Sequence, residues 1–210
     1  MKNRQLLKAF TLAETLITLA IIGFIAAITI PSLVNHLNNS QYKTAYKKAV
    51  SIASQAMKKG TADNLFKSRT SYYDHVANYE NWNVFKSYFN VTKDCNNNNN
   101  SQCWNHSGEK SNSTPVDDQP HAFIDSSGMA WSMRGPNTSS VGDTSYILVD
   151  TNGFKGPNKY GKDRFVLLFG DKENKSTGIP EKIVTYDDYI SPNYLYCPSG
   201  ECYYKSWLID

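Results

Sequence analysis

The sequence predicts an α+β fold in which a long amino-terminal helix packs against a small antiparallel β-sheet. Two patterns lead to this prediction. An uncharged apolar run near the amino terminus passes into a segment with apolar residues at helical spacing. Short runs of β-branched and aromatic residues then follow, separated by Gly, Asn, Asp and Ser. Because one helix precedes a group of short strands, an α+β arrangement is favoured over an alternating α/β one.

The apolar run covers residues 10–34 and is long enough to cross a membrane. As an α-helix it would extend roughly 38 Å, whereas the hydrocarbon core of a bilayer is about 30 Å thick. No Asp, Glu, Lys or Arg occurs from Thr15 to Tyr42, and basic residues precede the run. This asymmetry predicts a cytoplasmic amino terminus and an extracytoplasmic carboxyl-terminal part. No second run reaches spanning length, which excludes a multi-pass membrane protein.

Glu14 is the exception within the apolar run. A carboxylate at membrane depth is costly, and its helix offers no cation three or four residues away. If the chain were cut before Phe10, the new α-amino group would lie four residues from Glu14. The amino group of one copy would then pair with Glu14 of a neighbouring copy. We therefore interpret Glu14 as a residue that favours assembly.

Residues 35–60 are predicted to continue the helix as an amphipathic segment. From Tyr42 onward, apolar and aromatic residues recur at i, i+3 and i+4, and the lysines fall mostly on the other face. Pro31 lacks an N–H and is expected to kink or locally open the helix. Gly60 is expected to end it. We interpret the apolar stripe as part of the core of the domain that follows.

Residues 61–210 are predicted to form an extracytoplasmic globular head with a surface loop at 95–119. Residues 63–94 favour helix and carry aromatic side chains at roughly helical spacing, which is more typical of a core than of a binding site. The loop is rich in Asn and Ser and poor in apolar residues. Strands are expected at 122–124, 129–131, 146–149 and 165–169, and the first two form a hairpin.

The charge balance argues against nucleic acid as a partner. The chain has 22 Lys+Arg and 19 Asp+Glu, a formal net charge of +3. Lys2, Arg4 and Lys8 account for this excess, so the basic and acidic residues after them balance. Binding of nucleic acid through counterion release is therefore not expected.

The amino-terminal residues carry a resemblance to a known family. Lys8-Ala9-Phe10-Thr11-Leu12-Ala13-Glu14, followed by the apolar run with Pro31, resembles the cleavage and methylation site of type IV pilins and pseudopilins. In that family, a prepilin peptidase removes a short basic leader, here residues 1–9, and methylates the new amino terminus, here Phe10. The family strongly prefers Gly before the cut, where this chain has Ala9. The alternative is an ordinary secretory signal peptide or a plain membrane anchor, but the apolar core of a signal peptide is shorter.

The resemblance implies a structural subunit of a type IV filament-type machine, either a pseudopilin or a minor pilin. Its implied location is the bacterial inner membrane, crossed once, and afterwards the filament. Its implied partners are other pilin or pseudopilin subunits, the prepilin peptidase and an inner-membrane assembly platform. The machine would serve protein secretion, pilus formation or DNA uptake.

Two other functions are alternatives to that of a filament subunit. A minor pilin at the filament tip would act as an adhesin or ligand-binding module, which the Asn- and Tyr-rich exterior permits. An anchored enzyme is not expected, because the scattered histidines lie outside known catalytic and metal-binding motifs.

Residues 150–163 resemble a D-x-N-G-x-K-G-P-N-x-x-G-x-D segment in the heads of pseudopilin-like proteins. Some pseudopilins hold calcium in a head loop, and Asp150, Asn152, Asn158 and Asp163 would supply hard oxygen ligands. The spacing does not match an EF-hand. We favour the interpretation as a Gly/Asn/Pro turn between two strands, without a cofactor, and keep calcium as the alternative.

The four cysteines are expected to form disulfides outside the membrane. Cys95, Cys103, Cys197 and Cys202 allow three connectivities, and we favour the local pairs Cys95–Cys103 and Cys197–Cys202. Neither spacing matches the close cysteine pairs of a zinc site, and an oxidising compartment favours disulfides. The Cys197–Cys202 loop is similar to the carboxyl-terminal disulfide loop of type IV pilins, although shorter.

Overall fold

The computed structural model describes residues 11–70, 74–95, 102–105, 121–133, 146–173 and 177–185. Contacts divide the chain into two compact units, residues 1–41 and 42–210, so the boundary falls inside the first helix. The helices in the described residues are α1 (Leu12–Ala62) and α2 (His75–Ser87). The strands are β1 (Val91–Asp94), β2 (His121–Asp125), β3 (Ala130–Met133), β4 (Tyr146–Asp150), β5 (Arg164–Gly170) and β6 (Lys182–Thr185).

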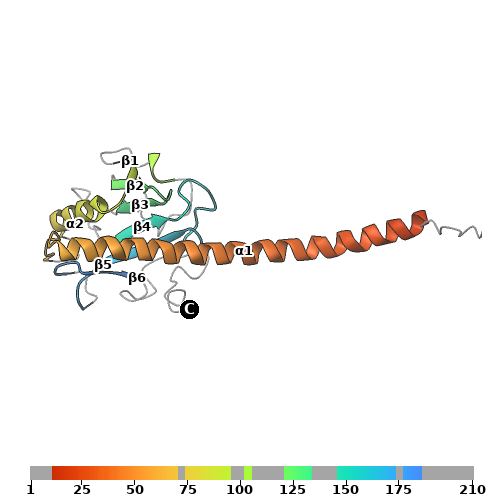
Figure 1. Ribbon diagram of the computed structural model, residues 1–210, viewed down its shortest axis with the longest axis horizontal. Coiled ribbons are helices and arrows are strands. Elements are labelled where there is room, and N and C mark those ends of the chain that lie inside the picture. Colours follow the sequence, from red (N-terminus) through yellow and green to blue (C-terminus); the bar gives the residue numbers. More distant parts are fainter. Residues whose placement is uncertain are drawn as a thin grey trace, which may run out of the picture. The chain divides into compact units, whose positions relative to one another are not determined.

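The strands form one antiparallel sheet in the order β1-β2-β3-β4-β5-β6, so each strand pairs with its neighbour in the sequence (Figure 1). The chain is therefore an α+β protein with one long apolar amino-terminal helix, as the sequence predicts at this coarser level. The four expected strands are confirmed as β2 to β5. The edge strands β1 and β6 were not expected. Each has four residues, of which at most two are apolar, so neither forms the apolar run that marks the four expected strands.

The part of α1 in the second unit packs on the sheet through its apolar stripe. Tyr46, Ala49, Ala53 and Met57 are each at most 2 % exposed and belong to one core cluster with side chains of β2 to β5. The two alanines let the helix approach the sheet closely, because each extends only a methyl group toward it. The prediction that this stripe lies in the core is confirmed.

Side chains on the sheet alternate between two buried faces, as the pleat of a strand requires. On β5, for example, Phe165, Leu167 and Phe169 join the core under α1, whereas Val166 and Leu168 join a second cluster on the opposite face. Trp104 and Tyr160 belong to that second cluster. The loops that bear these two aromatic residues are thereby held against the sheet.

Helix α2 packs on the same core as α1. The ring of Trp82 lies 5.3 Å from that of Phe123, and the ring of Phe85 lies 6.0 Å from that of Trp131 and 5.4 Å from that of Phe169. Trp82 and Phe85 are fully buried, so the interpretation of this aromatic stripe as core is confirmed.

Gly60 does not end α1, so this expectation was wrong. The helix continues through Gly60 to Ala62. A Cβ atom built at Gly60 would lie 2.6 Å from Cε2 of Phe66 and 3.2 Å from Cε2 of Tyr88. The absence of a side chain makes room for these two rings. Glycine is therefore explained here by close packing rather than by the backbone conformation of a helix end.

Candidate functional site

Two parts of the chain carry the residues singled out from the sequence, and they belong to different units. The first is the start of α1, with Glu14 and Pro31. The second is the loop between β4 and β5, with the four oxygen-bearing residues proposed as calcium ligands. Ala9, Phe10, Cys197 and Cys202 lie outside the described residues.

Glu14 has a hydrogen-bonding partner in its own helix. Its Oε2 accepts a hydrogen bond from the backbone N–H of Thr11 and another from the Thr11 hydroxyl, both at 2.9 Å. The Thr11 hydroxyl in turn accepts from the Glu14 N–H at 3.2 Å. This is a capping box, in which the first residue and the glutamate three positions later satisfy each other's N–H groups. The sequence carries this signature as Thr-x-x-Glu before an apolar run.

The first half of α1 presents apolar side chains to its surroundings. Every large apolar residue from Leu12 to Val34 is at least 47 % exposed. An 18-residue window of α1 has a mean hydropathy of 2.4, and the helix is long and apolar enough to cross a membrane. The exposed large apolar residues of this segment are Leu12, Leu16, Ile17, Leu19, Ile21, Ile22, Phe24, Ile25, Ile28, Ile30, Leu33 and Val34.

The polar side chains of this segment bond to its own backbone. The hydroxyls of Thr15, Thr18 and Thr29 donate to carbonyl oxygens three or four residues earlier, at 2.8 to 2.9 Å. Pro31 lies inside α1 and cannot donate to the carbonyl of Ala27. In a medium without water, polar groups must be satisfied internally, and the threonines meet this requirement.

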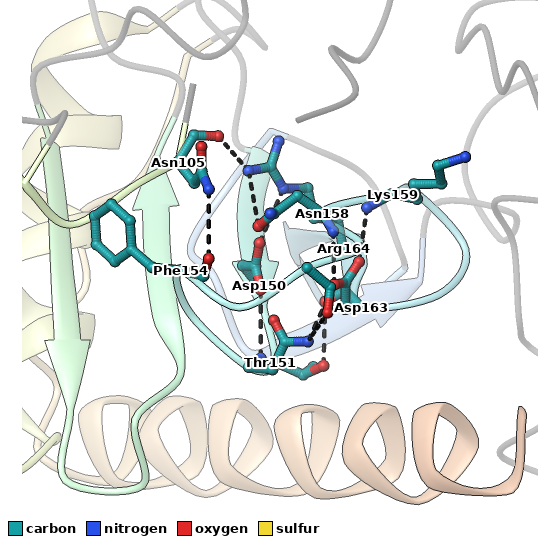
Figure 2. Close-up of polar contacts among 10 residues, drawn as sticks. Asn105, Asp150, Thr151, Phe154, Asn158, Lys159, Asp163 and Arg164 are labelled. Atoms are coloured by element: carbon teal, nitrogen blue, oxygen red, sulfur yellow. Dashed lines mark hydrogen bonds and ion pairs between the residues drawn. The ribbon is translucent and has the colours of Figure 1, made fainter. Parts of the chain in front are cut away.

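The β4–β5 loop brings together Asp150, Asn152, Asn158 and Asp163 (Figure 2). Asp163 is fully buried and organises the loop. Its Oδ2 accepts from the N–H of Asn158 at 2.8 Å and from Nδ2 of Asn152 at 3.1 Å, and its Oδ1 accepts from the N–H of Lys159 at 2.7 Å. Asn158 adopts φ +50°, a conformation that Asn tolerates better than most residues.

Asp150 uses its carboxylate differently. Its Oδ1 accepts from the N–H of Asn152 at 3.3 Å, and its Oδ2 accepts from Nε of Arg164 at 2.9 Å. Burial raises the pKa of Asp150 to about 7, and the charge of Asp163 adds to this rise, whereas the hydrogen bond and the charge of Arg164 act in the opposite direction. The pair is almost wholly buried, with the Arg164 and Asp150 side chains 0 % and 1 % exposed.

The oxygens of this loop do not fit calcium as they stand. Calcium takes about six to eight oxygen ligands, but the carboxylate oxygens of Asp150 and Asp163 all accept N–H groups. Asn152 Oδ1 is buried and has no hydrogen-bond partner in the part of the chain that the structure describes, and a single such oxygen is too few for a calcium site. Among the described residues, no group of three or more His, Cys, Asp or Glu side chains is placed to hold a metal ion.

A disulfide joins the two ends of the 95–103 segment. Cys95 follows β1 and is joined to Cys103, with Cα atoms 6.0 Å apart, which is the local pairing expected from the sequence. The next residues, Trp104 and Asn105, reach the β4–β5 loop. Asn105 Nδ2 donates to the carbonyl of Phe154 at 3.4 Å, and Arg164 donates to the Asn105 carbonyl. Sequence reasoning did not identify Trp104, Asn105 or Arg164, because their roles depend on contacts between distant segments.

His121 is a further buried titratable residue, at the start of β2. Its side chain lies against the ring of Tyr79, with ring centres 4.7 Å apart, and its Nδ1 has no hydrogen-bond partner among the described residues. Burial lowers the pKa of His121, and the positive charge of Lys86 lowers it further, against a smaller opposite effect of Asp94. The folded protein therefore favours the neutral imidazole.

Comparisons with models of known protein families, with curated proteins and with solved structures gave no match to this chain.

Proposed function

We propose that the protein is a structural subunit of a type IV filament-type machine, a pseudopilin or minor pilin. The observation that carries this proposal is the Lys8–Glu14 sequence, which leads into the first turn of a helix with exposed apolar side chains. In the proposed sequence of events, prepilin peptidase removes residues 1–9 and methylates Phe10. The subunit then waits in the inner membrane, and the assembly platform transfers it into the filament.

The properties of α1 support insertion in a membrane. Its apolar side chains from Leu12 to Val34 are exposed, and its threonine hydroxyls bond within the helix. Both properties favour a lipid environment, where the hydrophobic effect favours burial of the apolar surface and unsatisfied polar groups are costly. In the filament, neighbouring subunits would cover the same apolar surface.

The hydrogen bonds of Glu14 suggest how this carboxylate is accommodated both in the single subunit in the membrane and in the filament. Both donors from Thr11 bond to Oε2, whereas Oε1 accepts no hydrogen bond from any described residue. The capping box provides a polar partner for the carboxylate while the subunit is alone. We propose that Oε1 then accepts the α-ammonium group of Phe10 from a neighbouring subunit. The added pair would balance the charge and fix the axial register of the two helices.

A pair of substitutions separates pairing from capping. Glu14→Gln keeps an oxygen for the Thr11 donors but removes the charge, so we expect normal membrane insertion and loss of incorporation into filaments. Thr11→Ala removes the hydroxyl but keeps the charge, so we expect filaments to form. Sheared filaments and membrane fractions from the native host would be compared by immunoblot. Normal incorporation of Glu14→Gln would refute the pairing role, and assembly failure of Thr11→Ala alone would assign Glu14 to capping.

Processing is tested by the intact mass and the amino-terminal sequence of the mature protein from its native host. We expect loss of residues 1–9 and a methylated Phe10. Replacement of Ala9 by Gly, the residue that the family has at this position, is expected to speed cleavage without changing its place. A mature protein that still begins at Met1 would contradict the proposed function.

A further inference from the structure

Arg164 contacts two of the residues considered as calcium ligands, Asp150 and Asn158 (Figure 2). Its guanidinium group is surrounded by oxygens from three parts of the chain. Nε donates to Asp150 Oδ2 at 2.9 Å, while Nη2 donates to the carbonyl of Asn105 and lies 3.5 Å from Asn158 Oδ1. A carboxylate, a backbone carbonyl and a side-chain amide are the oxygen types that typically ligate calcium.

The aromatic ring of Trp104 covers the guanidinium group from one side. The guanidinium carbon of Arg164 lies 4.7 Å from the centre of this ring, within the range of a cation–π interaction. Trp104 and Arg164 are both fully buried. The guanidinium group thus has an aromatic ring against one face and oxygen acceptors for Nε and Nη2, an arrangement that suits its planar shape.

The covering segment is itself anchored. Cys103 precedes Trp104 and is joined to Cys95, whose N–H donates to the carbonyl of Ala122 on β2 at 2.9 Å. Cys95 and Cys103 are 2 % and 0 % exposed. The disulfide thus ties the Trp104–Asn105 segment to the sheet, and Arg164 ties the β4–β5 loop to that segment.

We propose that Arg164 is the built-in cation of this loop, so that the loop and the Trp104–Asn105 segment form one unit that is stable without calcium. A covalently attached cation does not dissociate, and the head would keep its structure whatever the calcium concentration outside the membrane. The proposal rests on the contacts of the loop and is independent of the proposed function.

The first test uses the full-length protein in detergent micelles at pH 8, with thermal unfolding followed by near-ultraviolet circular dichroism. We expect the same Tm for the wild type with EDTA, without addition and with Ca²⁺. A Tm that falls with EDTA and returns with Ca²⁺ would overturn the proposal. This arm requires no substitution, so it remains decisive if a variant fails to fold.

The second test removes the cation. Arg164→Met keeps much of the side-chain volume but leaves Asp150 buried and unpaired, so we expect Tm to fall by roughly 6–20 °C. Lys86→Met is the matched control, because Lys86 pairs with Asp94 at 2.8 Å near the surface, with side chains 15 % and 47 % exposed. We expect its Tm to change by less than about 3 °C.

A double variant distinguishes the charge of Arg164 from its packing. If the unpaired carboxylate causes the loss, Asp150→Asn will raise the Tm of Arg164→Met although it lowers that of the wild type. If the two losses simply add, or if Arg164→Met behaves like the Lys86→Met control, Arg164 does not act as the cation of the loop.

Discussion

Asp125 is expected to be a strong determinant of head stability, and substitution by alanine tests this. Asp125 ends β2 and is only 4 % exposed. Its Oδ1 accepts from the N–H and hydroxyl of Ser127 and from the N–H of Met129, at 2.8, 2.6 and 3.1 Å. Its Oδ2 accepts from Nε1 of Trp131 at 2.8 Å. One carboxylate therefore shapes the β2–β3 turn and satisfies a core indole.

The expected loss follows from the donors that remain. Asp125→Ala leaves the Met129 N–H and the Trp131 Nε1–H without this acceptor in a region that is at most 2 % exposed. A buried donor without a partner costs about 1–3 kcal/mol, so we expect the free energy of unfolding to fall by roughly 2–6 kcal/mol. Asp125→Asn retains one oxygen but turns an NH₂ group toward one set of donors, and we expect about half that loss.

The assay is urea unfolding of the full-length protein in micelles, followed by tryptophan fluorescence. Asp171→Ala is the matched control, because Asp171 also accepts the N–H two residues later, at 2.9 Å from Glu173, but lies nearer the surface. We expect the control to lose less than about 1 kcal/mol. Trp131→Phe should cost less in the Asp125→Ala background than in the wild type, because it removes the orphaned donor. Equal losses for Asp125→Ala and Asp171→Ala would refute this reasoning.

Two further predictions concern buried positions of the head. Because the pKa of His121 lies below its usual 6.5 in the folded state, its contribution to stability should be complete above pH 6.5 and be lost as the pH falls through the folded pKa. Asp150, with its pKa raised to about 7, acts in the opposite direction as the pH falls. The free energy of unfolding of the wild type should therefore fall more steeply on acidification than that of His121→Gln, and parallel curves would contradict the assignment. Gly60→Val should lower the free energy of unfolding of residues 42–210 by about 1–3 kcal/mol, because its Cβ would overlap the Phe66 ring. Gly23→Ala is the control, since a Cβ there meets no atom within 4 Å. An unchanged free energy of unfolding in Gly60→Val would argue against close packing at this position.

Local patterns were sufficient to predict the elements with strong periodicity. The long helix follows from helical spacing, and the strands β2 to β5 follow from short apolar runs between turn residues, so both depend on residues that are close in the sequence. The end of α1 was misjudged at Gly60, because Phe66 and Tyr88 fold back on that position. The requirement for a glycine at position 60 comes from packing against these two rings, which the neighbouring residues in the sequence do not reveal.

The function of the β4–β5 loop also depends on contacts between residues that are distant in the sequence. Its residue types are compatible with calcium and with a simple turn, and the sequence offers no way to decide which oxygens face a cation. Arg164 directly follows Asp163 in the sequence, but its role in the loop depends on contacts with Asn105 and Trp104, which are distant in the sequence. These residues are brought beside it by the disulfide and by the antiparallel pairing of the strands.

By itself, the sequence determined the apolar amino-terminal helix, the single carboxylate within it and the expectation of a small antiparallel sheet. These features depend on composition and periodicity, which are properties of neighbouring residues. Only the tertiary structure decided that the Phe66 ring packs against Gly60, and that the Trp104–Asn105 segment meets Arg164 beside the β4–β5 loop. Side-chain geometry and long-range contacts set these outcomes, because hydrogen bonds and close packing depend on distances in space rather than on order along the chain.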